Sequence, residues 1–466
     1  MRTARVLRTA ASGFASLSFA AISVSSAAAD TNVTEVAATA HAQRTVNLVG
    51  WAIGPDDPAI HRAENLEAAV DLMNAALEER GADYRVAIET DFETVSWDDY
   101  RRRILLGFES GQAPDIIVSS HVDIATWADA GYIAPLDGYI AEYEAFDDVA
   151  DSLWDFVTYK GQVWGVPLNP EARPFYFNKT LLRELGWSDE DVAALPERVL
   201  NGEFTWRDVI DVSVQAVEAG VIEEGYGYWH RPVNGPDFFH TYYAFGGRLQ
   251  DAETGDLVFT RDAALGMFTL YRDMVEQGVL SRDVINMPWN DWHRAVTDGR
   301  VLFNSAGTWT WAQWAVEFGL GFEAVEESFG FALQPAAEPG GRPNTLWQPL
   351  AHMLFAGSEN LDVAAELLSH VVAPELDVRA LESAHLPVLE STRALPEFVE
   401  DEFLSQVVYM LDHTTAQPIH PGFGRYSDIF FRAISAVEAG QVSPEEGVEI
   451  VVDELQRALG DEVVIE

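Results

Sequence analysis

The sequence predicts an α/β protein with more than one lobe. Its 466 residues exceed what a single hydrophobic core usually supports. Short apolar runs alternate with longer amphipathic segments, an order that predicts parallel strands joined by helical crossovers. Hydrophobic residues make up 48% of the chain, which is ordinary for a globular protein and argues against disorder.

The alternation begins close to the N-terminus. Apolar residues recur on one stripe of the first amphipathic segment, and a glycine follows its last turn as helix C-caps require. The third apolar run, DIIV, is a continuous run typical of a strand buried on both faces. Here we expect strands at 45–51, 84–90 and 115–118, and helices at 59–81, 97–110 and 122–130.

The same pattern continues to the C-terminus. The segment 159–168 predicts a hairpin-like turn followed by a short strand. Glycines end several of the later helical segments. We expect further strands at 175–177, 225–231, 301–303 and 329–333, and helices at 178–186, 204–220, 237–245, 261–277, 290–298, 361–372, 397–413, 429–439 and 444–459.

The polar residues Ser119, Ser120 and His121 come directly after the third expected strand. In open α/β sheets ligands bind beyond this end of the strands, where helix N-termini present free N–H groups. Ser120 and His121 are therefore candidate ligand contacts. The alternative is a capped helix start, in which the serines serve only the backbone.

Charge and cysteine content exclude several classes of protein. The formal net charge is −46, which argues against nucleic acid as a partner and disfavours an anionic membrane surface. The absence of cysteine excludes disulfides, thiolate metal sites and a catalytic cysteine. Residues 1–29 combine three arginines, a moderately apolar stretch and a final Ala-Ala-Ala, as in a signal peptide. We expect a periplasmic protein that has no lipid anchor.

Enzyme signatures are missing from the sequence. It contains no Walker loop, no H-E-x-x-H and no G-x-S-x-G, and its 11 histidines do not fall at metal-ligand spacings. We therefore expect no catalytic residues, no metal and no cofactor.

Tryptophan is the residue type that indicates a ligand. Several of the 14 tryptophans fall at strand ends or in loops, close to acidic, amide and arginine side chains. An indole face packs well against a sugar ring, and the polar groups then hydrogen-bond the hydroxyls. The alternative for each tryptophan is a place in the core. The candidates in these segments are Trp51, Asp56, Arg62, Glu171, Arg173, Trp229, His230, Arg231, Trp289, Trp309, Trp347 and Gln348.

An ordered series of short motifs resembles the family 1 extracellular solute-binding proteins, the sugar-binding kind. The resemblance covers nearly the whole mature chain. No single motif is specific, but the ordered set is. The motifs are SGQAPDII (110–117), WADAGYIAPLD (127–137), KGQVWGVP (160–167), FYFNK (175–179), GGRL (246–249), GRVLF (299–303), GTW (307–309) and AGQVSPEEG (439–447).

The resemblance implies the two-lobe periplasmic binding protein fold, type II-like, with a hinge and an inter-lobe ligand cleft. Trp309 matches the family's stacking aromatic residue and Glu171 a cleft carboxylate, while Asp56 lies in the loop after the first strand. Asp237 and Phe238 precede the Gly-Gly turn. The implied parts are a signal peptide (1–29), an N-terminal lobe (30–167 with 337–388) and a C-terminal lobe (168–336 with 389–466).

The expected function is that of the periplasmic substrate-binding component of an ABC importer. It would be a monomer that binds a carbohydrate between its lobes, closes on it and delivers it to a membrane permease. The arginines in the expected cleft leave an anionic sugar possible. The sequence also leaves open a secreted carbohydrate-active enzyme, or the same fold with a non-sugar solute such as a polyamine.

Overall fold

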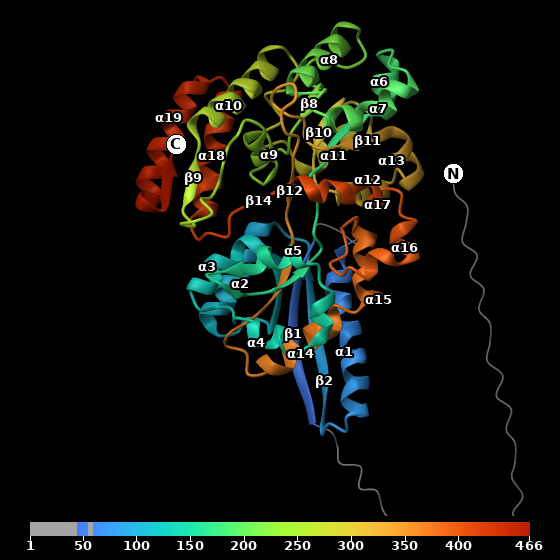
Figure 1. Cartoon of the computed structure of the whole chain (residues 1–466), viewed down its shortest axis with the longest axis vertical. Coiled ribbons are helices and arrows are strands. Elements are labelled where there is room, and N and C mark those ends of the chain that lie inside the picture. Colours follow the sequence, from blue (N-terminus) through green and yellow to red (C-terminus); the bar gives the residue numbers. More distant parts are fainter. Residues whose placement is uncertain (1–43, 55–58) are drawn as a thin grey trace, which may run out of the picture. The chain divides into compact units, whose positions relative to one another are not determined.

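The computed structural model describes residues 44–54 and 59–466, and these described residues belong to one compact unit. Two sheets organise the described residues (Figure 1). The first sheet has five strands in the order β2-β1-β3-β13-β6. Their bounds are Arg44–Ile53 (β1), Tyr84–Glu93 (β2), Ile116–Ser120 (β3), Val166–Leu168 (β6) and Leu350–Leu354 (β13).

Strand β1 pairs in parallel with both β2 and β3, as the alternating sequence predicts. Strand β13 comes from far along the chain and joins antiparallel to β3 and β6. Both faces of this sheet are covered, because Ile116 packs in one core cluster and its neighbour Ile117 in another. The prediction that this run is buried on both faces is confirmed.

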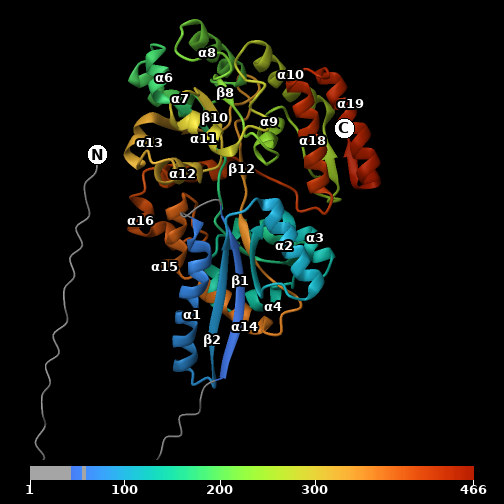
Figure 2. The ribbon, with the colours of Figure 1, turned by 180° about the vertical axis from the view of Figure 1, so that it is seen from behind.

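Helices cover the two faces of the first sheet. Helices α1 (His61–Glu79) and α14 (Leu361–Val371) pack together beside β2, and α2 (Trp97–Ser110) lies across the sheet from them (Figure 2). Helix α2 begins at the N-cap Ser96, whose hydroxyl accepts from the N–H of Asp99, and ends at Gly111 in the left-handed conformation. Shorter helices are α3 (Ile124–Asp129), α4 (Asp137–Ile140), α5 (Asp151–Trp154) and α15 (Pro374–Asp377).

The second sheet has four strands in the order β11-β7-β10-β8. Their bounds are Phe175–Asn178 (β7), Tyr228–Trp229 (β8), Phe303–Ser305 (β10) and Phe329–Ala332 (β11). Strand β7 is antiparallel to β10 and β11, while β10 is parallel to β8. The helices around it are α6 (Lys179–Glu184), α7 (Asp189–Leu200), α8 (Trp206–Glu218), α9 (Asp237–Ala244), α10 (Arg261–Glu276), α11 (Trp289–Thr297), α12 (Thr310–Val316) and α13 (Phe322–Ser328).

The C-terminal part of the chain packs on the second sheet's helices. Helices α18 (Phe423–Glu438) and α19 (Pro444–Leu459) contact each other and α10. Small two-stranded pairs complete the fold. These are β4 (Thr158–Tyr159) with β5 (Gln162–Val163), β9 (Leu257–Phe259) with β15 (Val463–Ile465), and β12 (Thr345–Trp347) with β14 (Thr414–Ala416).

Chain segments that pass between the two sheets position the candidate site. The chain leaves the first sheet after β6 and enters the second at β7, through residues 169–174. It returns after β11, through β12 and residues 348–349, to β13. These crossing segments carry Glu171, Arg173, Trp347 and Gln348.

Some sequence-based predictions of elements are wrong. The segment 397–413 is not one helix but α16 (Pro396–Val399), α17 (Leu404–Val407) and a 3-10 turn. The break is stabilised by Asp401, whose carboxylate accepts from the N–H groups of Phe403 and Leu404. Helix α7 is absent from the predictions, although the Ser188–Asp191 capping box marks its start.

None of the helices in residues 44–54 and 59–466 has the length and apolarity that crossing a membrane requires.

Candidate functional site

Arg173 is the centre of the candidate site. Its side chain is 4% exposed, and its guanidinium group joins three other residues. One nitrogen, Nη1, donates to both carboxylate oxygens of Asp237 at 3.3 and 3.2 Å. The other, Nη2, donates to Oε1 of Glu171 and, at 3.0 Å, to the amide oxygen of Gln348. Residues that are far apart in sequence therefore meet at one buried cation.

The backbone holds Arg173 in place. Its N–H donates to the hydroxyl of Thr345 at 2.8 Å, and its carbonyl accepts from Nε2 of Gln334 at 2.8 Å. Both partners lie on the stretch that leads back to the first sheet, so the two crossing segments are bonded to each other. A buried charge needs such fixed partners, because its desolvation otherwise costs several kcal/mol.

Arg231 is the second cation on Asp237. Its Nη1 donates to Oδ2 of Asp237 at 3.2 Å, and its side chain is 18% exposed. Burial works against ionisation of Asp237, but Arg173 and Arg231 outweigh it and hold the pKa of that carboxyl below its ordinary value. Burial raises the pKa of Glu171, although Arg173 opposes the rise. The four charges of this cluster sum to zero when all are ionised.

Gln348 links the charged cluster to the first sheet. Its amide nitrogen lies 3.5 Å from the hydroxyl of Ser120, the last residue of β3. The predicted junction after the third strand therefore adjoins the cluster. Its neighbour Ser119 instead donates to Asp123 at 2.7 Å.

Tryptophan rings stack beside the cluster. Trp289 lies between Trp292, at 6.2 Å and 14° between planes, and Trp309, at 5.7 Å and 25°. The guanidinium of Arg231 lies 5.3 Å from the ring centre of Trp289, a cation–π contact that joins the stack to the cluster. Both Trp289 and Trp309 are partly exposed. In the described part of the chain, Trp289 is the one ring that stacks on Trp309, and the His293 ring meets Trp309 edge-on at 6.1 Å.

Gly307 brings the stack and the cluster together. A Cβ atom at this position would lie 2.1 Å from Nε1 of Trp309 and 2.6 Å from Oε2 of Glu171. The indole edge and the carboxylate therefore both occupy the space that a side chain would take. Glycine at 307 is a condition for this geometry.

Several polar atoms around this site are buried and have no hydrogen-bond partner among the described residues. They belong to the crossing segments and to the residues that contact them. A buried donor or acceptor without a partner costs about 1–3 kcal/mol, so a group of them indicates a place where a ligand supplies the partners. These atoms are Oε2 of Glu171, Nε of Arg173, Nε of Arg231, Oγ1 of Thr308 and Nε1 of Trp347.

Arg62 makes its hydrogen bonds outside the charged cluster. The charge of Glu171 nevertheless acts to raise the pKa of Arg62. It is 3% exposed and donates to the carbonyl of Ile53 at 2.7 Å and to the amide oxygen of Asn169 at 2.9 Å. Burial lowers its pKa to about 10. It joins α1 to the end of β1 and to the crossing segment 169–174, so its role is to hold that segment in place.

Trp51, His121 and Trp347 lie on or beside the first sheet. The Trp51 ring is covered by the guanidinium of Arg103 at 3.8 Å. The ring of His121 is fully buried, and its Nδ1 donates to the carbonyl of Pro349 at 3.0 Å. Burial lowers the pKa of His121 to about 4, so the ring is neutral at pH 7. Trp347 stacks on Phe156 at 6.1 Å.

Three candidates lie in the core of the second sheet's lobe. Trp229 is 1% exposed, and its N–H donates to the carbonyl of Gly225 at 2.7 Å. His230 pairs with Glu438 at 3.0 Å, and Phe238 packs on the His230 ring at 4.9 Å. Their positions favour packing roles, and ligand contact by these residues stays a prediction. Asp56 lies outside the described residues.

The sequence-based candidates do not include Gly307. The G-T-W motif before α12 could have indicated it, because a small residue beside a functional aromatic allows close approach. No group of three or more acidic residues or histidines in the described ranges is arranged to hold a metal ion.

The chain belongs to the family of bacterial extracellular solute-binding proteins, whose sequence model matches residues 63–376. Members of this family act in the periplasm or outside the cell. A relative in Brucella abortus, named as a binding protein, is 20% identical over 361 residues, which is 77% of this chain and 82% of the relative.

Solved structures of similar fold confirm the two-lobe architecture. A solute-binding protein of an ABC transporter from Thermotoga lettingae, bound to α-D-tagatose, has a TM-score of 0.71 at 18% identity, covering 89% of this chain and all of that one. A cyclic α-maltosyl-1,6-maltose binding protein from Arthrobacter globiformis has a TM-score of 0.69 at 22% identity, covering 90% of this chain and all of that one. The fold is that of the two-lobe periplasmic sugar-binding proteins.

Proposed function

We propose that this protein is the substrate-binding component of an ABC importer and that its ligand is a carbohydrate. The observation that carries the proposal is the set of buried, unpartnered donors and acceptors next to the partly exposed indole of Trp309. A sugar offers an apolar C–H face and hydroxyls that both donate and accept, which is the complement of this site. The ligands of similarly folded proteins, tagatose and a cyclic maltosyl-maltose, support the same class.

The site favours a neutral sugar over an anionic one. Arg173 is occupied by Glu171, Asp237 and Gln348, so its charge is neutralised inside the protein. Arg231 also has its partners within the protein, because it donates to Asp237 and lies over the ring of Trp289. The cluster offers a polyamine no net attraction either, because its two guanidinium groups balance its two carboxylates.

A glycoside hydrolase is the second candidate, since it also needs two carboxyl groups at a sugar. Asp237 is fully buried with two arginines as counter-ions, which suits charge balance better than proton transfer or nucleophilic attack. We therefore assign no catalytic residues. Release of chromophore from a panel of chromogenic glycosides by the pure protein would contradict this assignment.

The remaining parts of the proposal concern export and delivery. Residues 1–29 act as a signal peptide, and the mature protein is a periplasmic monomer. Residues 30–167 with 337–388 form one lobe and residues 168–336 with 389–466 the other. The lobes close on the sugar about the crossing segments, and the closed form is the one that the membrane permease accepts.

Native mass spectrometry of freshly purified protein, followed by a thermal-shift screen against sugars, tests the ligand class. We expect either a bound mass equal to one or more sugar units, or a rise in melting temperature with particular neutral sugars. Stabilisation by polyamines or peptides and by no sugar would contradict the proposal.

A further inference from the structure

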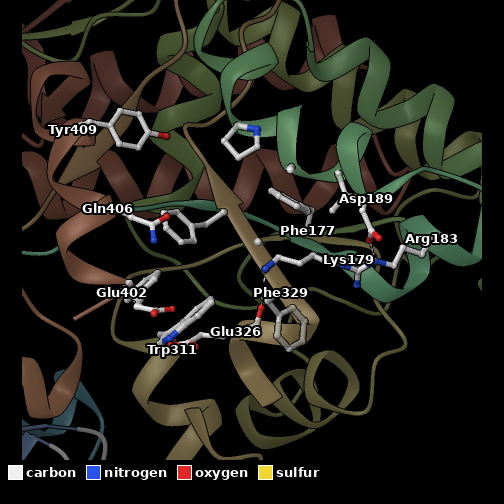
Figure 3. Close-up of a pocket in the computed structure, with 16 residues that line it drawn as sticks. Phe177, Lys179, Arg183, Asp189, Trp311, Glu326, Phe329, Glu402, Gln406 and Tyr409 are labelled. Atoms are coloured by element: carbon white, nitrogen blue, oxygen red, sulfur yellow. Dashed lines mark hydrogen bonds and ion pairs between the residues drawn. The ribbon is translucent and has the colours of Figure 1, made fainter. Parts of the chain in front are cut away.

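A cavity of about 400 Å³ lies among elements of the second sheet's lobe and shares no residue with the candidate sugar site. Its volume is within the range of about 300–1,000 Å³ that small-molecule sites occupy. Figure 3 shows its walls: Lys179, Arg183 and Asp189 on one side, Gln406 and Tyr409 on the opposite side, and Trp311 and Glu326 between them.

The floor of the cavity is aromatic. Trp311 and Phe403 stack face to face, with ring centres 4.2 Å apart and 1° between planes. Phe331 stands nearly perpendicular to both, at 84° to Trp311 and 83° to Phe403. Gly330 lines the same floor, and a Cβ there would lie 2.2 Å from the ring of Phe177. Aromatic surfaces of this kind attract hydrocarbon groups and cations.

The cationic side chains of the cavity already have acceptors. Lys179 donates through Nζ to the main-chain carbonyl of Glu326 at 2.7 Å. Arg183 donates through Nε to Asp189 at 2.7 Å. Each of these two cations therefore already has an acceptor within the protein.

The cavity's acceptors are not engaged. Within residues 44–54 and 59–466, the carboxylates of Glu326 and Glu402 have neither a hydrogen bond nor an ion pair. Both line the cavity. Burial and the nearby carboxylates of Glu402 and Asp401 raise the pKa of Glu326, although the charge of Lys179 opposes the rise, and a cation between the carboxylates would relieve the remaining repulsion.

One buried donor without a partner also lines the cavity. Trp311 is 3% exposed, and its Nε1–H has no acceptor among the described residues. A ligand that carries a hydroxyl or ether oxygen would satisfy it.

We propose that this cavity is a second ligand site, which binds a small organic ammonium compound with an apolar body. The ammonium group lies between Glu326 and Glu402, and the apolar body rests on Phe331 and the edges of Trp311 and Phe403. The class follows from free acceptors, engaged donors and aromatic walls in one cavity.

Calorimetric titration of the full mature chain with 2-amino-1-phenylethanol (the amine), and separately with the neutral 1-phenyl-1,2-ethanediol (the alcohol), tests the proposal. We expect one amine bound per chain, with at least tenfold weaker binding of the alcohol. In the variant with Glu326→Gln and Glu402→Gln, we expect the amine affinity to fall at least tenfold, while the alcohol affinity stays the same.

Glu327→Gln is the matched control, because Glu327 is exposed on the same helix and does not line the cavity. We expect it to bind the amine as the unmodified chain does. Equal binding of amine and alcohol, no amine binding at millimolar concentration, or an equal loss in the control would each overturn the proposal.

Discussion

At the scale of the residue, Gly307 shows how one atom decides whether the site forms. The Nε1 atom of Trp309 and the Oε2 atom of Glu171 both approach the position of its missing side chain. In the proposed sugar site, these two groups are the stacking surface and an acceptor for hydroxyls. Their proximity, and not either residue alone, provides a sugar with an apolar face and a polar edge at once.

Gly307→Ala should weaken sugar binding at least tenfold, because the new methyl group must displace the Trp309 ring or the Glu171 carboxylate. Calorimetry with the sugar found in the thermal-shift screen measures the change. Gly138→Ala is the control, since a Cβ at Gly138 meets no atom within 4 Å. The two variants should therefore differ in affinity, and equal affinities would contradict this role for Gly307.

At the scale of the element, the crossing segments have two tasks. They connect the sheets, and they carry the buried charges of the site. Arg173 on the segment between β6 and β7 bonds Asp237 at the start of α9 and Gln348 before β13. A change in this one side chain should therefore affect both the stability of the fold and the affinity for the ligand.

Arg173→Met should lower the free energy of unfolding by roughly 3–5 kcal/mol, because it leaves the Glu171 carboxylate buried without its counter-ion. Chemical denaturation at pH 7 measures this loss. Arg432→Met removes an exposed partner of Glu454 and should cost no more than about 1 kcal/mol. Similar losses in the two variants would show that the buried cluster does not support the fold.

The sequence predicts the elements better than it predicts the site. Long amphipathic segments such as α1, α10 and α19 follow from periodicity, because one face must be buried. The strand expected at 225–231 forms over only two residues, β8, and so short an element could not show that Trp229 and His230 face the core while Arg231 faces the cluster. The meeting of Asp237 with Arg173, 64 residues apart, depends on tertiary packing that local patterns do not encode.

At the scale of the whole molecule, burial keeps several histidines neutral. It lowers the pKa of His121 to about 4 and those of His240, His293 and His352 to about 3. The unfolded chain binds these protons near pH 6.5, and the folded chain binds them only at much lower pH. Acid therefore favours unfolding. The contribution of these histidines to the free energy of unfolding falls as the pH drops from 6.5 toward 4.

His352→Leu should flatten this dependence. His352 is buried in β13, and neither ring nitrogen has a partner among the described residues. Between pH 7 and pH 5 the unmodified protein should lose about 2 kcal/mol more stability than the variant. Urea denaturation at the two pH values measures both losses, and equal losses would contradict the assignment of His352 as a buried neutral group.

The central claim is that a carbohydrate stacks on Trp309 beside the Arg173 cluster, and calorimetry with a neutral sugar tests it most directly. Trp309→Ala should weaken binding at least a hundredfold. Trp187→Ala removes a partly exposed tryptophan that packs on Phe204 and Arg198, away from the site, and should leave the affinity unchanged. If Trp309→Ala binds the sugar as tightly as the Trp187→Ala control does, the sugar does not stack on Trp309, and the central claim is contradicted.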